Sequence, residues 1–118
     1  MRGKKLWLRS LSLVVSLLLI TVAAAAERKV IGKWLDKVGP IEQQITIEQE
    51  GEKFYRTSTF HDGSSSRSEL VEVKAKSGEK QRFKDPKSGY GESYAIKSDG
   101  NLALYDSEGF IREAKKIQ

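Results

Sequence analysis

The sequence predicts an all-β fold, an antiparallel up-and-down meander of about eight short strands in a small β-barrel or sandwich, following an N-terminal signal peptide. Beyond residue 26, short runs of β-branched and aromatic residues alternate with polar residues at the period of two that half-buried strands show. Turns with glycine separate these runs at intervals of roughly 8 to 12 residues, which is typical of meander barrels and sandwiches. The turn glycines are Gly51, Gly63, Gly78, Gly89, Gly100 and Gly109.

Residues 1–26 are expected to be a secretory signal peptide. Four basic residues among the first nine precede an apolar run over residues 11–22, and residues 23–26 are all alanine. This order is that of a cleaved signal. The alternative is an uncleaved anchor, but residues 11–26 are fewer than the roughly 20 apolar residues that span a bilayer. We therefore expect cleavage after Ala26 or nearby, no transmembrane span after cleavage, and a location in the periplasm or outside the cell.

The charge of the mature chain argues against nucleic-acid binding. Four of the 21 Lys and Arg residues lie in residues 1–26 and none of the 16 Asp and Glu residues do, which leaves 17 against 16 and a formal net charge of +1. The basic balance of the whole chain thus comes mostly from the signal peptide. The chain has no Cys, which excludes disulfides, thiol catalysis and Cys-type zinc sites. By length, residues 27–118 form one small domain.

Residues 28–36 are expected to form the first strand. Val30 and Trp34 fall on one strand face with Gly32 between them, where the glycine leaves room for another backbone. A short amphipathic helix is the alternative, because the apolar residues of this stretch also fit helical spacing. The Gly-Pro pair at 39–40 ends the element in either case.

The next four runs predict two hairpins. Residues 41–49 and 53–60 alternate apolar and polar residues on either side of a turn at Gly51. Residues 64–67 are expected to form a flexible polar loop, and the strand over residues 69–75 then follows. In that strand we expect inward side chains at Val71, Val73 and Ala75 and outward ones at Leu70, Glu72 and Lys74. The strand over residues 80–84 returns with Phe83 as its only large apolar residue, before a Pro-containing loop.

The last third of the chain is the clearest part of the meander. Residues 90–96, 101–105 and 110–117 are β-rich runs, and the turns between them end in Gly100 and Gly109. An Asp-Gly or Glu-Gly pair between such runs favours a tight hairpin, because glycine accepts the positive φ that the turn needs.

Basic residues of the hairpin over residues 74–87 predict a partner-binding surface. On each strand they occupy alternate positions, and so lie on the face opposite the apolar residues. Together they are expected to form a basic stripe. Such a stripe attracts an acidic partner protein or an anionic envelope component. The alternative is a solvated face that discourages edge-to-edge pairing of the sheet. The residues are Lys74, Lys76, Lys80, Arg82 and Lys84. The loop over residues 64–67 is expected to extend this surface.

Gly32-Lys33-Trp34 on the first strand and Arg112 on the last strand of a meander resemble the pattern of the lipocalin or calycin family. In that family a Gly-x-Trp sequence opens the barrel and an arginine of the final strand lies across the Trp ring. The resemblance implies that Gly32, Trp34 and Arg112 are structural residues, with a cation–π contact between the guanidinium and the indole. It also implies an alternative function, the carriage of a small apolar ligand.

Tyr94 and Tyr105 are the candidate ligand-binding residues. The interior of an eight-stranded barrel is either filled by side chains or holds one small ligand. Most large aromatic residues of the mature chain are expected to form the core. These two tyrosines carry a hydroxyl that can point toward a barrel mouth.

Enzymatic chemistry finds little support in the sequence. His61 is the only histidine, and its neighbours Asp62 and Ser64 lie beside it on a turn, which is not the geometry of a catalytic triad. The acidic turns after residues 98 and 105 lack the spacing of a calcium loop. We expect an exported, non-enzymatic binding protein without cofactor or metal. The first hypothesis is a protein-interaction module of a bacterial-type envelope, such as an inhibitor, adaptor or accessory subunit.

Overall fold

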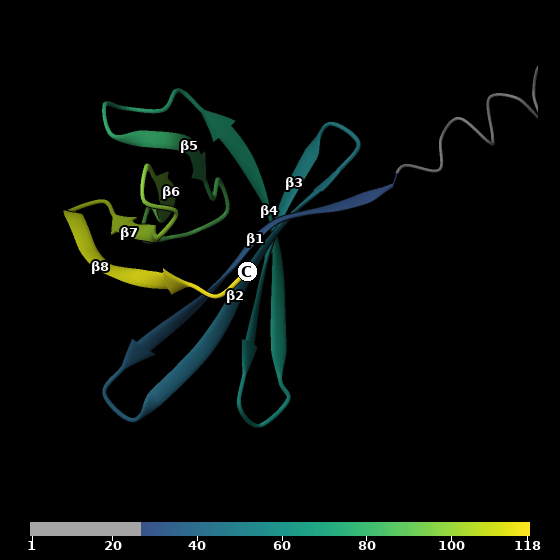
Figure 1. The fold of residues 1–118 in the computed structure, drawn as a ribbon, viewed down its shortest axis with the longest axis vertical. Coiled ribbons are helices and arrows are strands. Elements are labelled where there is room, and N and C mark those ends of the chain that lie inside the picture. Colours follow the sequence, from purple (N-terminus) through teal and green to yellow (C-terminus); the bar gives the residue numbers. More distant parts are fainter. Residues whose placement is uncertain (1–26) are drawn as a thin grey trace, which may run out of the picture.

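The computed structural model of the chain describes residues 27–118, and the predicted signal peptide lies outside the described residues. The described part folds into eight antiparallel strands that close into a barrel in chain order (Figure 1). The strands are β1 (Arg28–Val38), β2 (Ile41–Glu50), β3 (Lys53–Phe60), β4 (Ser65–Val73), β5 (Glu79–Lys84), β6 (Ser93–Lys97), β7 (Leu102–Asp106) and β8 (Gly109–Lys116). The predicted all-β meander is confirmed, as a barrel, and the first element is a strand and not a helix.

Within residues 27–118 the structure contains no helix that is long and apolar enough to cross a membrane.

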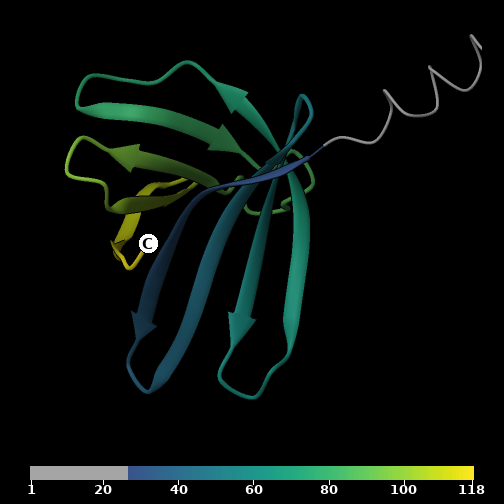
Figure 2. The same ribbon diagram turned by 45° about the vertical axis from the view of Figure 1, so that its right-hand side comes forward.

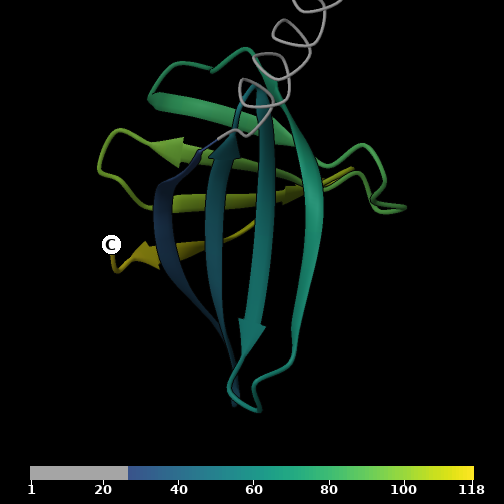
Figure 3. The same cartoon turned by 90° about the vertical axis from the view of Figure 1, so that its right-hand side faces the viewer.

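The barrel consists of two groups of strands that cross. The long strands β1–β4 lie side by side, and the shorter strands β5–β8 run across them (Figures 2 and 3). The two seams between the groups are short: β4 pairs with β5 over three residues, and β1 pairs with β8 over two. The β1–β2 and β3–β4 turns extend past the shorter strands (Figure 2), and this end of the barrel is called the mouth below.

The core lies between the two groups, toward the end opposite the mouth. Its center is Trp34, which is 1% exposed and whose Nε1 donates a hydrogen bond of 2.8 Å to the carbonyl oxygen of Gly100 in the β6–β7 turn. This bond ties the first strand to a turn 66 residues later. The other large members of the core are Ile45, Ile47, Phe54, Leu70, Phe83, Tyr94, Ile96, Leu102 and Leu104.

Gly32 has no side chain because the Trp34 ring occupies that space. The β1–β2 register shifts between Val30 and Gly32, and a Cβ on Gly32 would lie 2.6 Å from Cη2 of Trp34. The sequence-based expectation that this glycine leaves room for a backbone is therefore modified: the group that it accommodates is the indole two residues later.

Replacing Gly32 by alanine is expected to destabilise the fold by about 1–3 kcal/mol, because the added methyl group overpacks the site against a ring that the barrel holds in place. The matched control is Gly89→Ala, since a Cβ at Gly89 meets nothing within 4 Å. Urea unfolding followed by circular dichroism measures both. Equal stabilities of the two variants would show that the Trp34 ring moves aside without cost.

The predicted facing of the fourth strand is wrong for its apolar residues, although Glu72 and Lys74 are exposed as expected. Leu70 is 3% exposed and belongs to the core, whereas Val71 is 48% exposed and Val73 also faces outward. The sequence has apolar residues on both parities of this strand, so alternation alone does not choose between them. The choice is made by register, because Leu70 pairs with the buried Phe54 of β3.

The polar loop predicted over residues 64–67 is mostly strand. Ser65, Ser66 and Arg67 begin β4 and pair with the last residues of β3. The turn is completed earlier, because Gly63 has a φ of 88° and the carboxylate of Asp62 accepts a bond of 2.9 Å from the Ser64 amide. Serine disfavours strands weakly, and the backbone ladder with β3 outweighs that preference.

Candidate functional site

The basic residues predicted to form one stripe occupy several different environments. Lys74 and Lys76 follow the end of β4, and Lys80 lies where the β5–β6 register shifts between Glu79 and Gln81. The register shift and the turn between the two strands change which face of the sheet successive residues occupy. The five basic residues therefore do not form one continuous stripe. Three of the five residues nevertheless line one hollow on the outside of the barrel, namely Lys76, Arg82 and Lys84.

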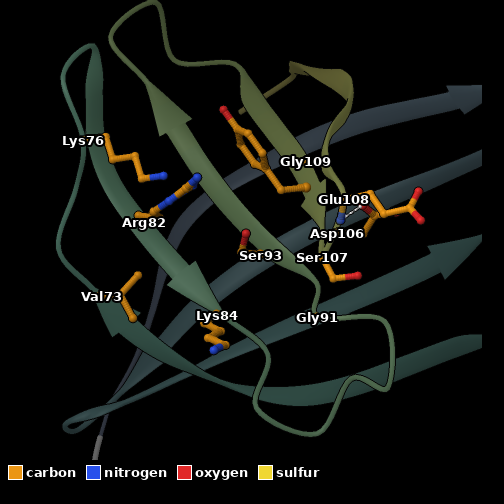
Figure 4. Close-up of a pocket in the computed structure, with 11 residues that line it drawn as sticks. Val73, Lys76, Arg82, Lys84, Gly91, Ser93, Asp106, Ser107, Glu108 and Gly109 are labelled. Atoms are coloured by element: carbon orange, nitrogen blue, oxygen red, sulfur yellow. Dashed lines mark hydrogen bonds between the residues drawn. The ribbon is translucent and has the colours of Figure 1, made fainter.

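This hollow, called the outer groove below, has a volume of about 500 Å³ and lies over β5, β6 and the β7–β8 turn. Figure 4 shows the basic side chains and Val73 along one side, and Asp106 and Glu108 along the other. The groove thus has a basic edge and an acidic edge. Its wall on the acidic side is a tight turn, in which Asp106 accepts a bond of 2.8 Å from the Glu108 amide.

Arg82 is the most firmly held residue of the outer groove. It is 6% exposed, its guanidinium carbon lies 4.4 Å from the center of the Tyr105 ring, and its Nε lies 3.7 Å from Glu79 Oε1. Its cross-strand neighbour on β6, Ala95, is small, and so is Ala103, which pairs with Ala95 on β7, so there is room for the arginine side chain to reach Tyr105. The Nη1 atom is buried without a hydrogen-bond partner among the described residues. A buried guanidinium donor without an acceptor costs free energy.

The two predicted ligand-binding tyrosines point to opposite faces of the sheet. Tyr94 belongs to the buried core, and its hydroxyl donates a bond of 3.2 Å to Glu92. Burial of the Tyr94 ring raises the pKa of its hydroxyl far above the usual value, so the group stays neutral. Tyr105 lies on the outside, where its ring packs edge-on against Phe110 and under Arg82.

The mouth of the barrel is polar. It contains a hollow of about 110 Å³ bordered by residues of β2, β3, β6, β7 and β8. These residues are Gln43, Ile45, Arg56, Glu92, Tyr94, Leu104, Tyr105, Ile111 and Arg112. The barrel interior is therefore apolar and filled at the Trp34 end and polar at the mouth.

Arg112 forms an ion pair with Asp36, and not the expected stack on Trp34. Its Nε and Nη2 each donate a bond of 2.7 Å to the Asp36 carboxylate, and Gln43 donates a third bond of 2.7 Å. The cation–π contacts in residues 27–118 involve other arginines. Burial alone would raise the pKa of Asp36, but the bonds from Arg112 and Gln43 outweigh it and hold the pKa below its usual value.

Sequence reasoning did not single out Asp36 or Arg56. Both lie at inward positions of strands whose other inward residues are mostly apolar, Asp36 two residues after Trp34 and Arg56 two residues after Phe54. The signal present in the sequence was a charged residue at a strand position that alternation assigns to the apolar, inward face. Arg56 donates bonds to Ser58 Oγ at 2.9 Å and Ser68 Oγ at 2.8 Å, and these hydroxyls occupy the same inward row.

The part of the chain that the structure describes contains no group of three or more residues arranged to hold a metal ion. His61 is exposed in the β3–β4 turn. The acidic residues of the C-terminal turns bond to their own backbone: Asp99 accepts a bond of 2.9 Å from the Asn101 amide. This is ordinary turn chemistry.

Comparisons with protein-family models, with curated proteins and with solved structures find no match to this chain. The likeness to lipocalins thus rests on the residues quoted above.

Proposed function

We propose that the chain is an exported, non-enzymatic binding protein that recognises a partner protein through the outer groove. The observation that carries this proposal is Arg82, whose guanidinium lies over the Tyr105 ring and which lines the basic edge of the outer groove. The flanking Lys76 and Lys84 add positive charge to the same edge. An acceptor-rich, acidic segment complements these donors.

The charge distribution favours a polypeptide over an anionic lipid surface. Asp106 and Glu108 lie along the edge opposite the basic side chains and would repel a uniformly negative surface. A peptide segment can place acidic side chains at the basic edge and its own amides or a basic residue at the acidic edge. Val73, Tyr105 and Phe110 lie at or beside the groove and offer apolar contact to such a segment.

Charge reversal at the groove is expected to abolish partner binding. A photo-crosslinking amino acid at Val73 is expected to give one discrete adduct in the native host, and the double variant Lys76→Glu/Lys84→Glu is expected to lose it. The matched control is Lys80→Glu, which changes charge by the same amount per residue on the same hairpin but does not border the groove. Loss of about tenfold or more in adduct yield is expected for the double variant, and little change for the control. Equal losses in both would refute the groove as the site.

Carriage of a small apolar ligand, the alternative function, has less support from the geometry. The hollow that reaches the interior measures about 110 Å³ and is bordered by charged groups, whereas typical sites for such ligands are roughly 300–1,000 Å³ and mostly apolar.

A further inference from the structure

Arg56 places a positive charge inside the mouth of the barrel without a carboxylate in contact. Within residues 27–118 its guanidinium takes part in no ion pair, and its acceptors are the two serine hydroxyls. The Nε atom is buried and has no acceptor among the described residues. The ring of Tyr94 lies 5.5 Å from the guanidinium carbon and covers one side. Most buried polar atoms have a hydrogen-bond partner, so the Nε atom is left unsatisfied although the residue as a whole is only half-buried.

The second arginine of the mouth, Arg112, has the carboxylate partner that Arg56 lacks. Arg112 borders the same hollow, but its charge is met by Asp36 through two bonds of 2.7 Å. Both carboxylate oxygens of Asp36 are occupied, since Gln43 also donates to one of them. Among the described residues the Asp36 carboxylate bonds to Arg112 and Gln43 and forms no hydrogen bond or ion pair with Arg56.

Glu92 is the acidic residue that borders the hollow itself. It accepts the Tyr94 hydroxyl at 3.2 Å and forms no ion pair with Arg56. With two arginines and two carboxylates, the mouth is formally neutral before any ligand enters. An incoming anion is therefore attracted by Arg56 at contact but repelled by Glu92 at longer range, so a single negative charge fits better than a double one.

We infer that the mouth binds a small monocarboxylate, whose oxygens accept hydrogen bonds from Arg56 in the hollow between Tyr94, Gln43 and Arg112. The planar carboxylate matches the fork of guanidinium donors. A hollow of about 110 Å³ suits a group of this size. This inference is independent of the outer groove, which lies on the other face of the sheet.

Acetate titration tests the inference on ¹⁵N-labelled protein produced from the full chain and exported by its host. The arginine Nε–H signals are recorded at constant ionic strength, with sodium chloride replaced stepwise by sodium acetate. We expect a saturable shift of the Arg56 signal with a Kd on the order of 1–10 mM, which is reasonable for so small a ligand. Arg67 serves as the internal control, because its guanidinium is outside the barrel, over Tyr55 and paired with Glu50.

Two variants change the affinity in opposite directions. Arg56→Gln is expected to abolish saturable acetate shifts at the Ser58 and Ser68 amides, while Arg67→Gln leaves them unchanged. Glu92→Gln is expected to tighten acetate binding about fivefold, because it removes the repelling charge. Retained amide dispersion shows that each variant is folded.

Three results would overturn the inference. The first is an Arg56 signal that does not saturate with acetate in the unmodified protein. The second is an equal response to inorganic phosphate, which would indicate general anion attraction. The third is a large shift of the Arg56 signal in Glu92→Gln without any acetate response, which would identify Glu92 as the counter-ion in solution.

Discussion

Replacing Trp34 by alanine is expected to lower the free energy of unfolding by about 3–5 kcal/mol. The indole is buried in the core of the barrel, and its Nε1 donates a hydrogen bond of 2.8 Å to the Gly100 carbonyl oxygen. The substitution therefore leaves both a cavity and a buried carbonyl without its donor. Small domains are stable by only about 5–15 kcal/mol, so this variant is expected to be partly unfolded at physiological temperature. Urea unfolding followed by circular dichroism measures the loss.

Two further substitutions separate the causes. Trp34→Phe keeps most of the ring but not the hydrogen bond, and we expect it to cost about 1–3 kcal/mol. Ile41→Ala removes an apolar side chain that is 55% exposed in the first hairpin and should cost less than about 1 kcal/mol. A Trp34→Ala loss no greater than that of Ile41→Ala would contradict the central position of Trp34.

The local parts of the fold could be predicted because they depend on short-range chemistry. The turns at Gly51 and Gly100 are examples: both glycines adopt positive φ, 65° and 92°, as the tight turns between the strands require. Strand order also follows from the sequence, because short turns force consecutive strands to pair. These two rules produce an up-and-down meander without any knowledge of the core.

The facing of side chains was less predictable where both parities carry apolar residues or where a bulge intervenes. Leu70 faces inward because of its partner on β3, and the register shift beside Lys80 separates it from the groove that Lys76 and Lys84 border. The facing of Leu70 and the position of Lys80 both depend on how neighbouring strands pair. Alternation within one strand does not specify that pairing.

The polar mouth could not be derived from the sequence for a different reason. Asp36 and Arg56 occupy positions that alternation assigns to the interior, and a charged group there is favourable only where partners or water reach it. At this end of the barrel β1–β4 extend past β5–β8 (Figure 2), and polar side chains from several strands border one hollow there. That difference in length is a property of the closed barrel.

The ion pair of Asp36 and Arg112 is expected to stabilise the fold by an amount that depends on pH. Arg112→Met leaves a buried carboxylate without its main partner and should cost about 2–4 kcal/mol at neutral pH, discounted because the arginine is partly exposed. In the unmodified protein the pKa of Asp36 is lowered in the folded state. This contribution is therefore present above the usual value of 3.8 and is lost as the pH falls through the lowered pKa.

In Arg112→Met the sign should reverse. Without the guanidinium, burial is the dominant influence and is expected to raise the pKa of Asp36 above its usual value. The folded state then binds a proton more tightly than the unfolded state, so this group gains stability as the pH falls through the raised pKa. The deficit of the variant should be largest near pH 7 and shrink in mild acid.

The control is Asp36→Asn/Arg112→Met, which has no titrating group at residue 36 and should show a deficit that changes little across the same pH range. Urea unfolding of all three proteins at several pH values between neutrality and mild acid gives the comparison. A deficit of Arg112→Met that stays constant with pH, as in the double variant, would mean that Asp36 does not stay buried once its partner is gone. The ion pair would then position the side chains of the mouth without compensating a buried charge.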